Sequence, residues 1–181
     1  MAPTRRRKAI EQKTRRQNRP GTKIEHHHLL LRLELQSCPT EADKGKIAHM
    51  IDQIIQDINM KSLAPAHVYY VKYPHYNEGL TGIVPIETSH IAFHFWTHPD
   101  PKLLHTANSN CLLEFDIYTC GSFSQRNVGK VLHHLTHFRP TYADITLLNR
   151  SKGLTIERHM HWSKTNSPTS WAEWLNTPAF Q

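Results

Sequence analysis

Two short stretches of the chain hold side chains that could do chemistry together. Residues 87–96 read Glu-Thr-Ser-His-Ile-Ala-Phe-His-Phe-Trp, and residues 115–121 read Phe-Asp-Ile-Tyr-Thr-Cys-Gly. They combine a hydroxyl at Ser89, an imidazole at His94 and a thiol at Cys120, which are groups used for nucleophilic attack and proton transfer. Taken singly, these would be an ordinary turn serine, a histidine on a polar strand face and a small buried cysteine. The chemical interpretation therefore requires all three together.

Together the two stretches resemble the signature of the pyruvoyl-dependent S-adenosylmethionine decarboxylases of the prokaryotic type. In that signature Ser-His-Ile and His-x-Trp are followed by Asp-x-x-Thr-Cys-Gly. A hydroxyl-Gly pair, here Thr81-Gly82, precedes the reactive serine by eight residues. The resemblance extends over residues 29–157, and its elements are short but rare and occur in the right order.

The resemblance implies a proenzyme that cuts its own backbone between Thr88 and Ser89, giving a β chain of residues 1–88 and an α chain of residues 89–181. The serine hydroxyl would attack the preceding carbonyl to form an ester. Elimination would then leave dehydroalanine, which hydrolyses to a pyruvoyl group. Because a hydroxyl is a weak nucleophile, this cut needs a base or a strained peptide, and an oxyanion donor. The family roles in processing fall on His94 and Thr81.

The pyruvoyl group derived from Ser89 would be the cofactor. Its ketone forms a Schiff base with the substrate amine and accepts the electrons that decarboxylation releases. A proton must then return to the substrate α-carbon from a placed acid, and the family gives that role to Cys120. The implied reaction converts S-adenosylmethionine to the aminopropyl donor of spermidine synthesis.

Two departures from the family pattern concern processing and substrate choice. Thr88 stands where the family has Glu directly before the reactive serine, which leaves slower cleavage, or its loss, open as an alternative. The family also continues Trp-Pro-Glu, whose carboxylate contacts the substrate ribose, whereas Trp96 is followed by residues 97–100 and a longer loop to Asn110. Asp100 is the positional candidate for that carboxylate. Arginine or ornithine therefore stays open as the substrate, and so does an uncleaved, non-catalytic homologue that acts as a binding partner.

Histidine is abundant, with 15 residues, which raises the possibility of a metal site. His90, His94 and His98 are spaced four residues apart. On a strand this spacing separates neighbouring ligands by about 13 Å, too far for one ion. We therefore expect no metal.

The formal net charge of +7 is concentrated in an N-terminal tail. Residues 1–23 contain nine Lys or Arg and one acid, which leaves the rest of the chain near neutral. This distribution argues against a basic nucleic-acid-binding domain. Because residues 1–24 have almost no apolar side chains, we expect a disordered tail, and we expect nucleic-acid contacts, if any, only there.

Hydrophobic periodicity predicts an α+β fold, a two-layer sandwich in which helices cover one face of an antiparallel sheet. Gly79–Gly82 is interpreted as a turn. Thr40 and Asp43 resemble a capping box, which should mark the start of the first helix. The predicted strands are residues 29–35, 67–73, 91–96, 112–119 and 143–148, and the predicted helices are residues 42–60 and 124–137.

The length favours one domain at residues 25–158, followed by a C-terminal extension at 159–181 that is loosely packed and whose tryptophans dock on the body. No apolar stretch suits a secretion signal or a membrane helix, so we expect a cytoplasmic protein without membrane contacts. Three cysteines at unrelated spacings argue against a disulfide framework. The resemblance further implies a homodimer of cleaved α and β chains acting on a small-molecule substrate.

Overall fold

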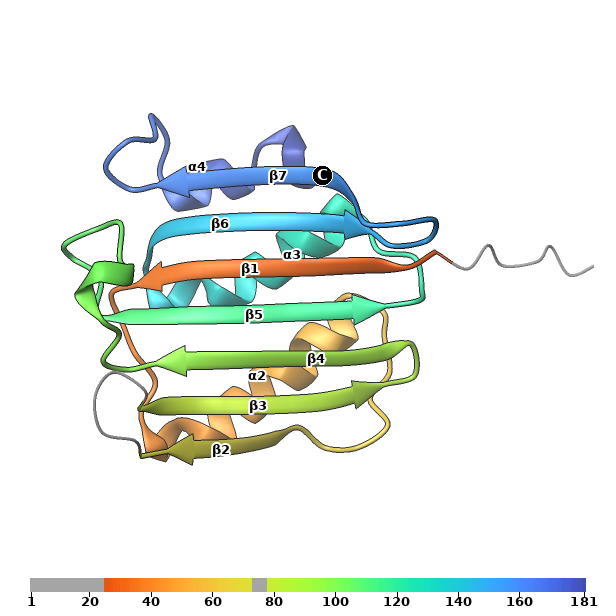
Figure 1. Cartoon of the computed structure of the whole chain (residues 1–181), viewed down its shortest axis with the longest axis horizontal. Coiled ribbons are helices and arrows are strands. Elements are labelled where there is room, and N and C mark those ends of the chain that lie inside the picture. Colours follow the sequence, from red (N-terminus) through yellow and green to blue (C-terminus); the bar gives the residue numbers. More distant parts are fainter. Residues whose placement is uncertain (1–24, 73–77) are drawn as a thin grey trace, which may run out of the picture.

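The computed structural model describes residues 25–72 and 78–181, so the predicted disordered tail lies outside the described residues. Seven antiparallel strands form one sheet in the order β2-β3-β4-β5-β1-β6-β7 (Figure 1). Helices α2 (Lys44–Asp57) and α3 (Gln125–Leu135) lie on one face of the sheet. The predicted α+β architecture is confirmed. The strands are β1 (His27–Leu35), β2 (His67–Val71), β3 (Gly79–Ile86), β4 (Ser89–Trp96), β5 (Cys111–Thr119), β6 (Pro140–Asn149) and β7 (Thr155–Ser163).

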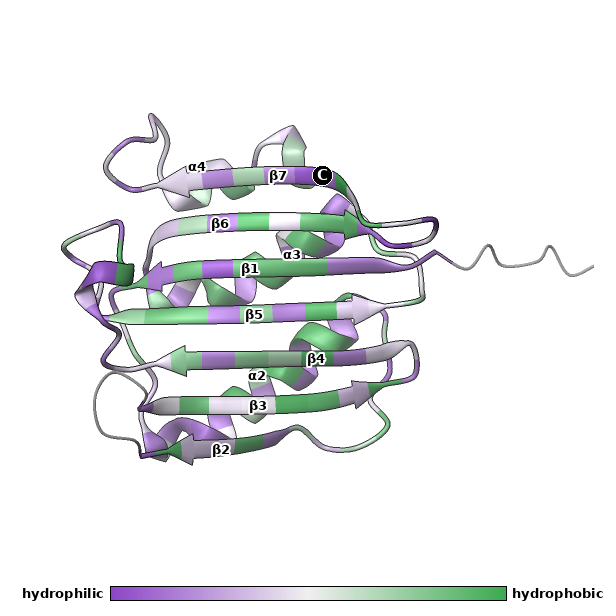
Figure 2. Ribbon diagram, viewed as in Figure 1, coloured by the Kyte–Doolittle hydropathy of each residue, from purple (hydrophilic) through white to green (hydrophobic). Residues whose placement is uncertain are grey.

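The core lies between the sheet and the helices. Along β1, β4 and β5, apolar residues that face the helices alternate with more polar residues on the opposite, helix-free face (Figure 2). The helices contribute one apolar stripe each, which is the pattern of an amphipathic helix on a sheet. Central core residues are Leu29, Leu33, Ile91, Phe95, Leu113 and Ile117 from the sheet, and Ile51, Ile54, Val128 and Leu132 from the helices.

Local capping defines where both predicted helices begin. The Thr40 backbone N–H donates to Asp43 Oδ2 at 2.9 Å, which is one of the two contacts of a capping box, and the Thr40 hydroxyl donates to the same oxygen at 2.7 Å. The short 3-10 helix η1 (Glu41–Asp43) follows this cap and leads into α2. Ser124 and Asn127 form the same arrangement at the start of α3.

The interpretation of Gly79–Gly82 as a turn is wrong, because these residues belong to β3. Gly82 pairs with Phe93 across β3 and β4. A Cβ atom at Gly82 would clash with the Phe93 ring and crowd the carbonyl of His67. The glycine is therefore needed for close packing inside the sheet rather than for a change of chain direction.

The C-terminal residues are an integral part of the fold. Strand β7 pairs with β6 along its length and crosses the predicted boundary at residue 158. Trp162 and Trp171 are buried in the core, with ring centroids 5.2 Å apart. Helix α4 (Trp171–Leu175) brings Trp174 against both rings. The tryptophans thus pack on the body, as expected, but the loosely packed extension is replaced by an edge strand and a helix.

The prediction against a disulfide is also wrong. Cys38 is bonded to Cys111, with their Cα atoms 5.4 Å apart, and Cys120 is the free cysteine. The two partners are 73 residues apart in sequence. The pairing of Leu35 in β1 with Cys111 in β5 brings the two cysteines together, which a spacing rule cannot anticipate.

None of the helices among residues 25–72 and 78–181 has the length and apolar character of a membrane span.

Candidate active site

Ser89 lies at the start of β4, directly after the two-residue turn that closes the β3–β4 hairpin. It pairs with Ile86 on one side and with Thr119 on the other. Its φ angle is +149°, a region that residues with a Cβ atom rarely adopt. Such a conformation costs about 1–3 kcal/mol and persists only where the surroundings impose it. The backbone is therefore strained at the residue that follows the predicted cut.

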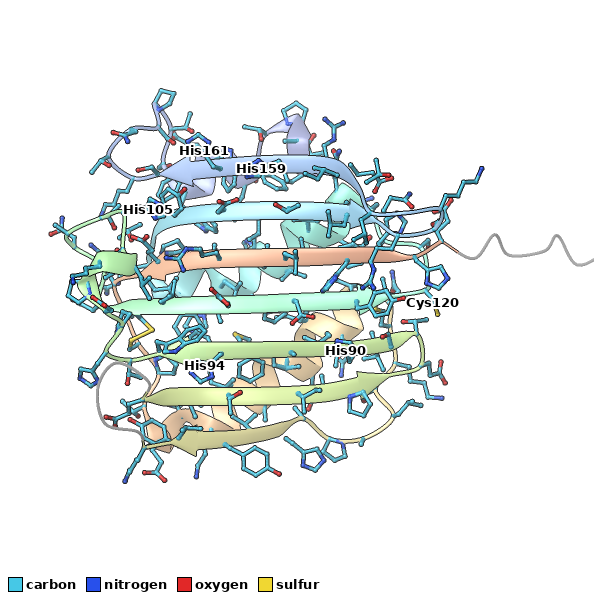
Figure 3. The ribbon with its side chains drawn as sticks, in the orientation of Figure 1. His90, His94, His105, Cys120, His159 and His161 are labelled. Carbon is cyan, nitrogen blue, oxygen red and sulfur yellow. A yellow bond between two sulfur atoms is a disulfide. The ribbon has the colours of Figure 1, made fainter. Side chains whose placement is uncertain are left out.

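The predicted cut also has a hydrogen-bond donor at its carbonyl. The backbone N–H of Cys120 donates to the Thr88 carbonyl oxygen at 2.9 Å. Gly121 keeps this approach open, because a Cβ atom there would lie 3.3 Å from the Thr88 Cγ2 methyl. Figure 3 shows Cys120 at the same end of the sheet as the β3–β4 turn. The structure thus brings Ser89, Thr88 and Cys120 together.

A polar cluster that the signature did not identify adjoins Ser89. Ser89 Oγ lies 3.1 Å from His90 Nδ1, and His90 Nε2 lies 3.7 Å from Asp116 Oδ2. The same carboxylate oxygen is 3.2 Å from His28 Nε2. The available sequence signal was the Ser-His pair together with the Asp of the second stretch, but sequence reasoning considered His90 only as a metal ligand.

Tyr118 and Arg150 complete this cluster. The Tyr118 ring centroid is 5.6 Å from that of His28 and 5.9 Å from that of His90. The Arg150 guanidinium carbon lies 4.3 Å from the centre of the Tyr118 ring, within the range of a cation–π contact. Arg150 Nη1 is also 3.3 Å from His28 Nδ1. Residues from β1, β4, β5 and the segment after β6 therefore converge beside Ser89.

His94 and Thr81 lie elsewhere on the sheet. They face each other across β3 and β4, and His94 is five residues beyond Ser89 on one extended strand. That separation is about 16–17 Å at the rise of a strand. Figure 3 shows His90 and His94 towards opposite ends of β4. Within one chain, the structure does not bring these two predicted processing residues to Ser89.

His94 is nevertheless in an unusual environment. Its ring centroid is 4.0 Å from that of Trp96, and its Nε2 atom is buried without a hydrogen-bond partner among the described residues. Burial lowers the pKa of His94 below its ordinary value, which favours the neutral ring. His94, Trp96 and Thr81 line a hollow of about 720 Å³ on the helix-free face.

Asp100 lies beyond the other end of β4. Its carboxylate accepts a hydrogen bond from the Lys102 backbone N–H at 2.9 Å and caps the short helix η2 (Pro101–Leu103). The structure therefore separates Asp100 from Ser89 within one chain and gives it a local capping contact.

Sequence reasoning also missed the fully buried carboxylate of Glu34 on β1. Glu34 Oε1 accepts from the His105 backbone N–H at 2.6 Å, and Oε2 accepts from the Thr106 backbone N–H at 3.0 Å. Hydroxyls of Thr106 and Ser109 also reach Oε2. Burial alone would raise the pKa of Glu34, but the hydrogen bonds from His105 and Thr106 outweigh it and lower the pKa. Glu34 anchors the loop between β4 and β5.

The many histidines do not gather into a metal site in the described part of the chain. Among residues 25–72 and 78–181, no group of three or more His, Cys, Asp or Glu side chains is arranged to hold a metal ion.

Comparison with known proteins adds one match. The model of the S-adenosylmethionine decarboxylase family matches residues 28–100. These residues include Thr81, Ser89 and His94, and the second stretch with Cys120 lies beyond them. No curated protein matches the chain significantly. The family match supports the assignment made from the signature, and with it a function of the S-adenosylmethionine decarboxylase kind.

Proposed function

We propose that this chain, assigned to the S-adenosylmethionine decarboxylase family by the match at residues 28–100, cuts itself before Ser89 and becomes a pyruvoyl-dependent S-adenosylmethionine decarboxylase. One observation carries the proposal. Ser89 has a strained backbone immediately after a carbonyl, that of Thr88, which is held by the N–H of Cys120. Strain at the attacking residue and a donor at the attacked carbonyl are two features that such a cut requires.

The donor at Thr88 has a direct chemical role. When Ser89 Oγ attacks the Thr88 carbonyl carbon, negative charge develops on the carbonyl oxygen. The Cys120 N–H is already directed at this oxygen, and one donor of this kind is typically worth about 100-fold to 1,000-fold in rate. In the single chain this donor is the Cys120 backbone, and not Thr81.

The same residues suit the later reaction. A pyruvoyl group formed from Ser89 would supply the ketone that accepts electrons released by decarboxylation. The Cys120 thiol would hold the proton that returns to the substrate α-carbon. This thiol is exposed, and it is free because Cys38 and Cys111 are bonded to each other. The pairing of Thr119 in β5 with residue 89 in β4 lies within the α chain and holds the neighbouring Cys120 beside the start of β4.

The positions of His94 and Thr81 support a homodimer. If these residues act on Ser89, they must come from a second copy, since one chain separates them by most of a strand. The helix-free face that carries them also exposes Leu30, Tyr69 and Ile83. Contact with a second copy would cover these apolar groups and could provide a partner for His94 Nε2.

Self-cleavage is the first test. Purified wild-type protein is expected to run on a denaturing gel as two fragments whose intact masses place the break before Ser89. Ser89→Ala should stay whole, whereas Ser122→Ala, an exposed serine at the same end of the sheet, should cut normally. An uncut wild type would point to the non-catalytic binding partner, and cleavage of Ser89→Ala would refute the assignment of the serine.

Substrate choice is tested on the cleaved protein. We expect carbon dioxide release from S-adenosylmethionine and not from arginine or ornithine. The altered segment after Trp96, in which Asp100 caps η2, is the observation that keeps the two other amino acids as alternatives. Preferential release from either of them would reassign the substrate while leaving the pyruvoyl chemistry in place.

The dimer is tested by complementation. Co-expression of Ser89→Ala and His94→Ala chains should restore cleavage in mixed dimers, because one copy supplies the serine and the other the histidine. Each variant alone should remain uncut. Absence of cleavage in a mixed dimer confirmed by mass would argue against sharing of the site between copies.

A further inference from the structure

We propose that His90 is the base that accepts the Ser89 hydroxyl proton in the first step of the backbone cut, and that Asp116 positions its ring. The inference rests on the proposed self-cleavage and assigns residues to its opening step. It is carried by the contact of 3.1 Å between Ser89 Oγ and His90 Nδ1.

This contact is unusual for neighbours on a strand. Successive side chains of an extended strand point to opposite faces of the sheet. The φ angle of +149° takes Ser89 out of the ordinary extended conformation, and its hydroxyl lies beside the ring of the next residue. The strained backbone therefore accompanies contact between nucleophile and base.

Asp116 occupies the position of the orienting group. Its Oδ2 atom is 3.7 Å from His90 Nε2, so a hydrogen on Nε2 is attracted to the carboxylate and leaves Nδ1 free to accept a proton. A nucleophile, a base and a group that orients the base are the general arrangement for activating a hydroxyl.

The charged and titratable groups around His90 come from several elements. Asp116 and Tyr118 lie on β5, and His28 on β1 shares the Asp116 carboxylate. Arg150 contacts both His28 and Tyr118 from the segment after β6. Asp116 thus lies between two imidazoles, one of which contacts the reacting serine.

The step balances without any further reactant. A bond forms between Ser89 Oγ and the Thr88 carbonyl carbon, and the hydroxyl proton moves to His90 Nδ1. The bond from that carbon to the Ser89 nitrogen then breaks, and the nitrogen takes up the proton held by His90. The product is an ester and a free amine, and His90 returns to its starting state.

The test follows cleavage over time in freshly synthesised full-length chains. His90→Ala should slow cleavage by about 100-fold or more, the usual size of a general-base effect. Added imidazole should restore part of the rate, which it would not do for a purely structural defect. The matched control is His133→Ala, which removes an exposed histidine from helix α3, away from the helix-free face, and should cut like the wild type.

The positioning role of Asp116 is tested in the same assay. Asp116→Asn should slow cleavage by about 10-fold, and Asp116→Glu should recover part of that loss because it restores the carboxylate. Equal rates for Asp116→Asn and the wild type would remove Asp116 from the proposal.

Hydroxylamine identifies the step that is blocked, because it cleaves an ester and not an ordinary peptide bond. His90→Ala chains should stay whole in hydroxylamine, since the ester has not formed. Release of fragments would show that His90 acts after the ester and would overturn the assignment. His90→Gln, which keeps a polar side chain, provides a second variant if His90→Ala does not fold.

The outcomes separate this inference from the proposed function. If the wild type cuts before Ser89 and both His90 variants cut at the same rate, only the role of His90 fails. If the folded wild type never cuts, self-cleavage itself fails and the inference fails with it.

Discussion

The two ends of the central strands differ in what holds them. We call residues 86–90 with 119–121 the hairpin end, and residues 34–38 with 97–111 the anchored end. The hairpin end carries the positive φ of Ser89 and the exposed thiol of Cys120. The anchored end carries the Cys38–Cys111 disulfide, drawn as a yellow bond in Figure 3. It also carries the buried Glu34 carboxylate.

This difference shows how one sheet can combine strain with stability. Strain at Ser89 persists because β4 is paired on both sides there, with Ile86 and with Thr119. The disulfide and the hydrogen bonds to Glu34 anchor the other ends of the same strands. Substitutions at the hairpin end should therefore change chemistry at little cost in stability, and substitutions at the anchored end should do the reverse.

The largest expected effect is at Cys120. Cys120→Ala keeps the backbone N–H that contacts Thr88, so the chain should still cut itself. Loss of the thiol should lower the rate of decarboxylation by about 100-fold to 10,000-fold. The readouts are the fragment pattern on a denaturing gel and the release of carbon dioxide. Loss of cleavage in this variant would show that the side chain also acts in processing.

The disulfide should give the next largest effect, on stability. Cys38→Ser should lower the free energy of unfolding by about 2–4 kcal/mol, because the unfolded chain loses a long cross-link. Urea titration measures the change, and Cys120→Ser is the matched control because it alters a free, exposed cysteine. An equal loss in both variants would contradict the special role of the anchored end.

The third largest effect is expected from substitution of Glu34, again on stability. Glu34→Gln replaces an acceptor of several hydrogen bonds by a group with one acceptor and one donor end, and we expect a loss of about 2–3 kcal/mol. Thermal and urea unfolding provide the measurement. The control is Glu114→Gln on the same sheet face, where the side chain is exposed and the effect should be within about 0.5 kcal/mol. Similar losses of stability in Glu34→Gln and Glu114→Gln would show that the burial of Glu34 contributes little to stability.

The smallest effect is the pH dependence of the same carboxylate. The pKa of Glu34 is lowered in the folded protein from an ordinary value of 4.5, so the folded state binds its proton less readily than the unfolded state. Its contribution to stability is therefore complete above that value and is lost as the pH falls through the folded pKa. The stability gap between wild type and Glu34→Gln should be constant near neutral pH and shrink in acid. A stability gap that widens in acid would contradict a lowered pKa of Glu34 in the folded protein.

Much of the fold followed from local patterns. Alternation along β1, β4 and β5 and the stripes of α2 and α3 predicted which faces are buried, because burial of one face imposes a period of two on strands and 3.6 on helices. Strand β7 was missed because most of its residues are exposed and it shows no such alternation. The prediction of a turn at Gly79 and Gly82 relied on the frequency of glycine in turns, although both residues belong to strand β3.

The sequence by itself determined the family resemblance, the sheet-and-helix pattern and the choice of Ser89 and Cys120, since these depend on residue order and short-range periodicity. Only the tertiary structure decided which of those residues meet. Register between strands places Cys120 at the Thr88 carbonyl and Asp116 beside His90, and it leaves His94 and Thr81 far from Ser89. The disulfide and the burial of Glu34 were decided in the same way, because pairing between distant segments has no local signature in the chain.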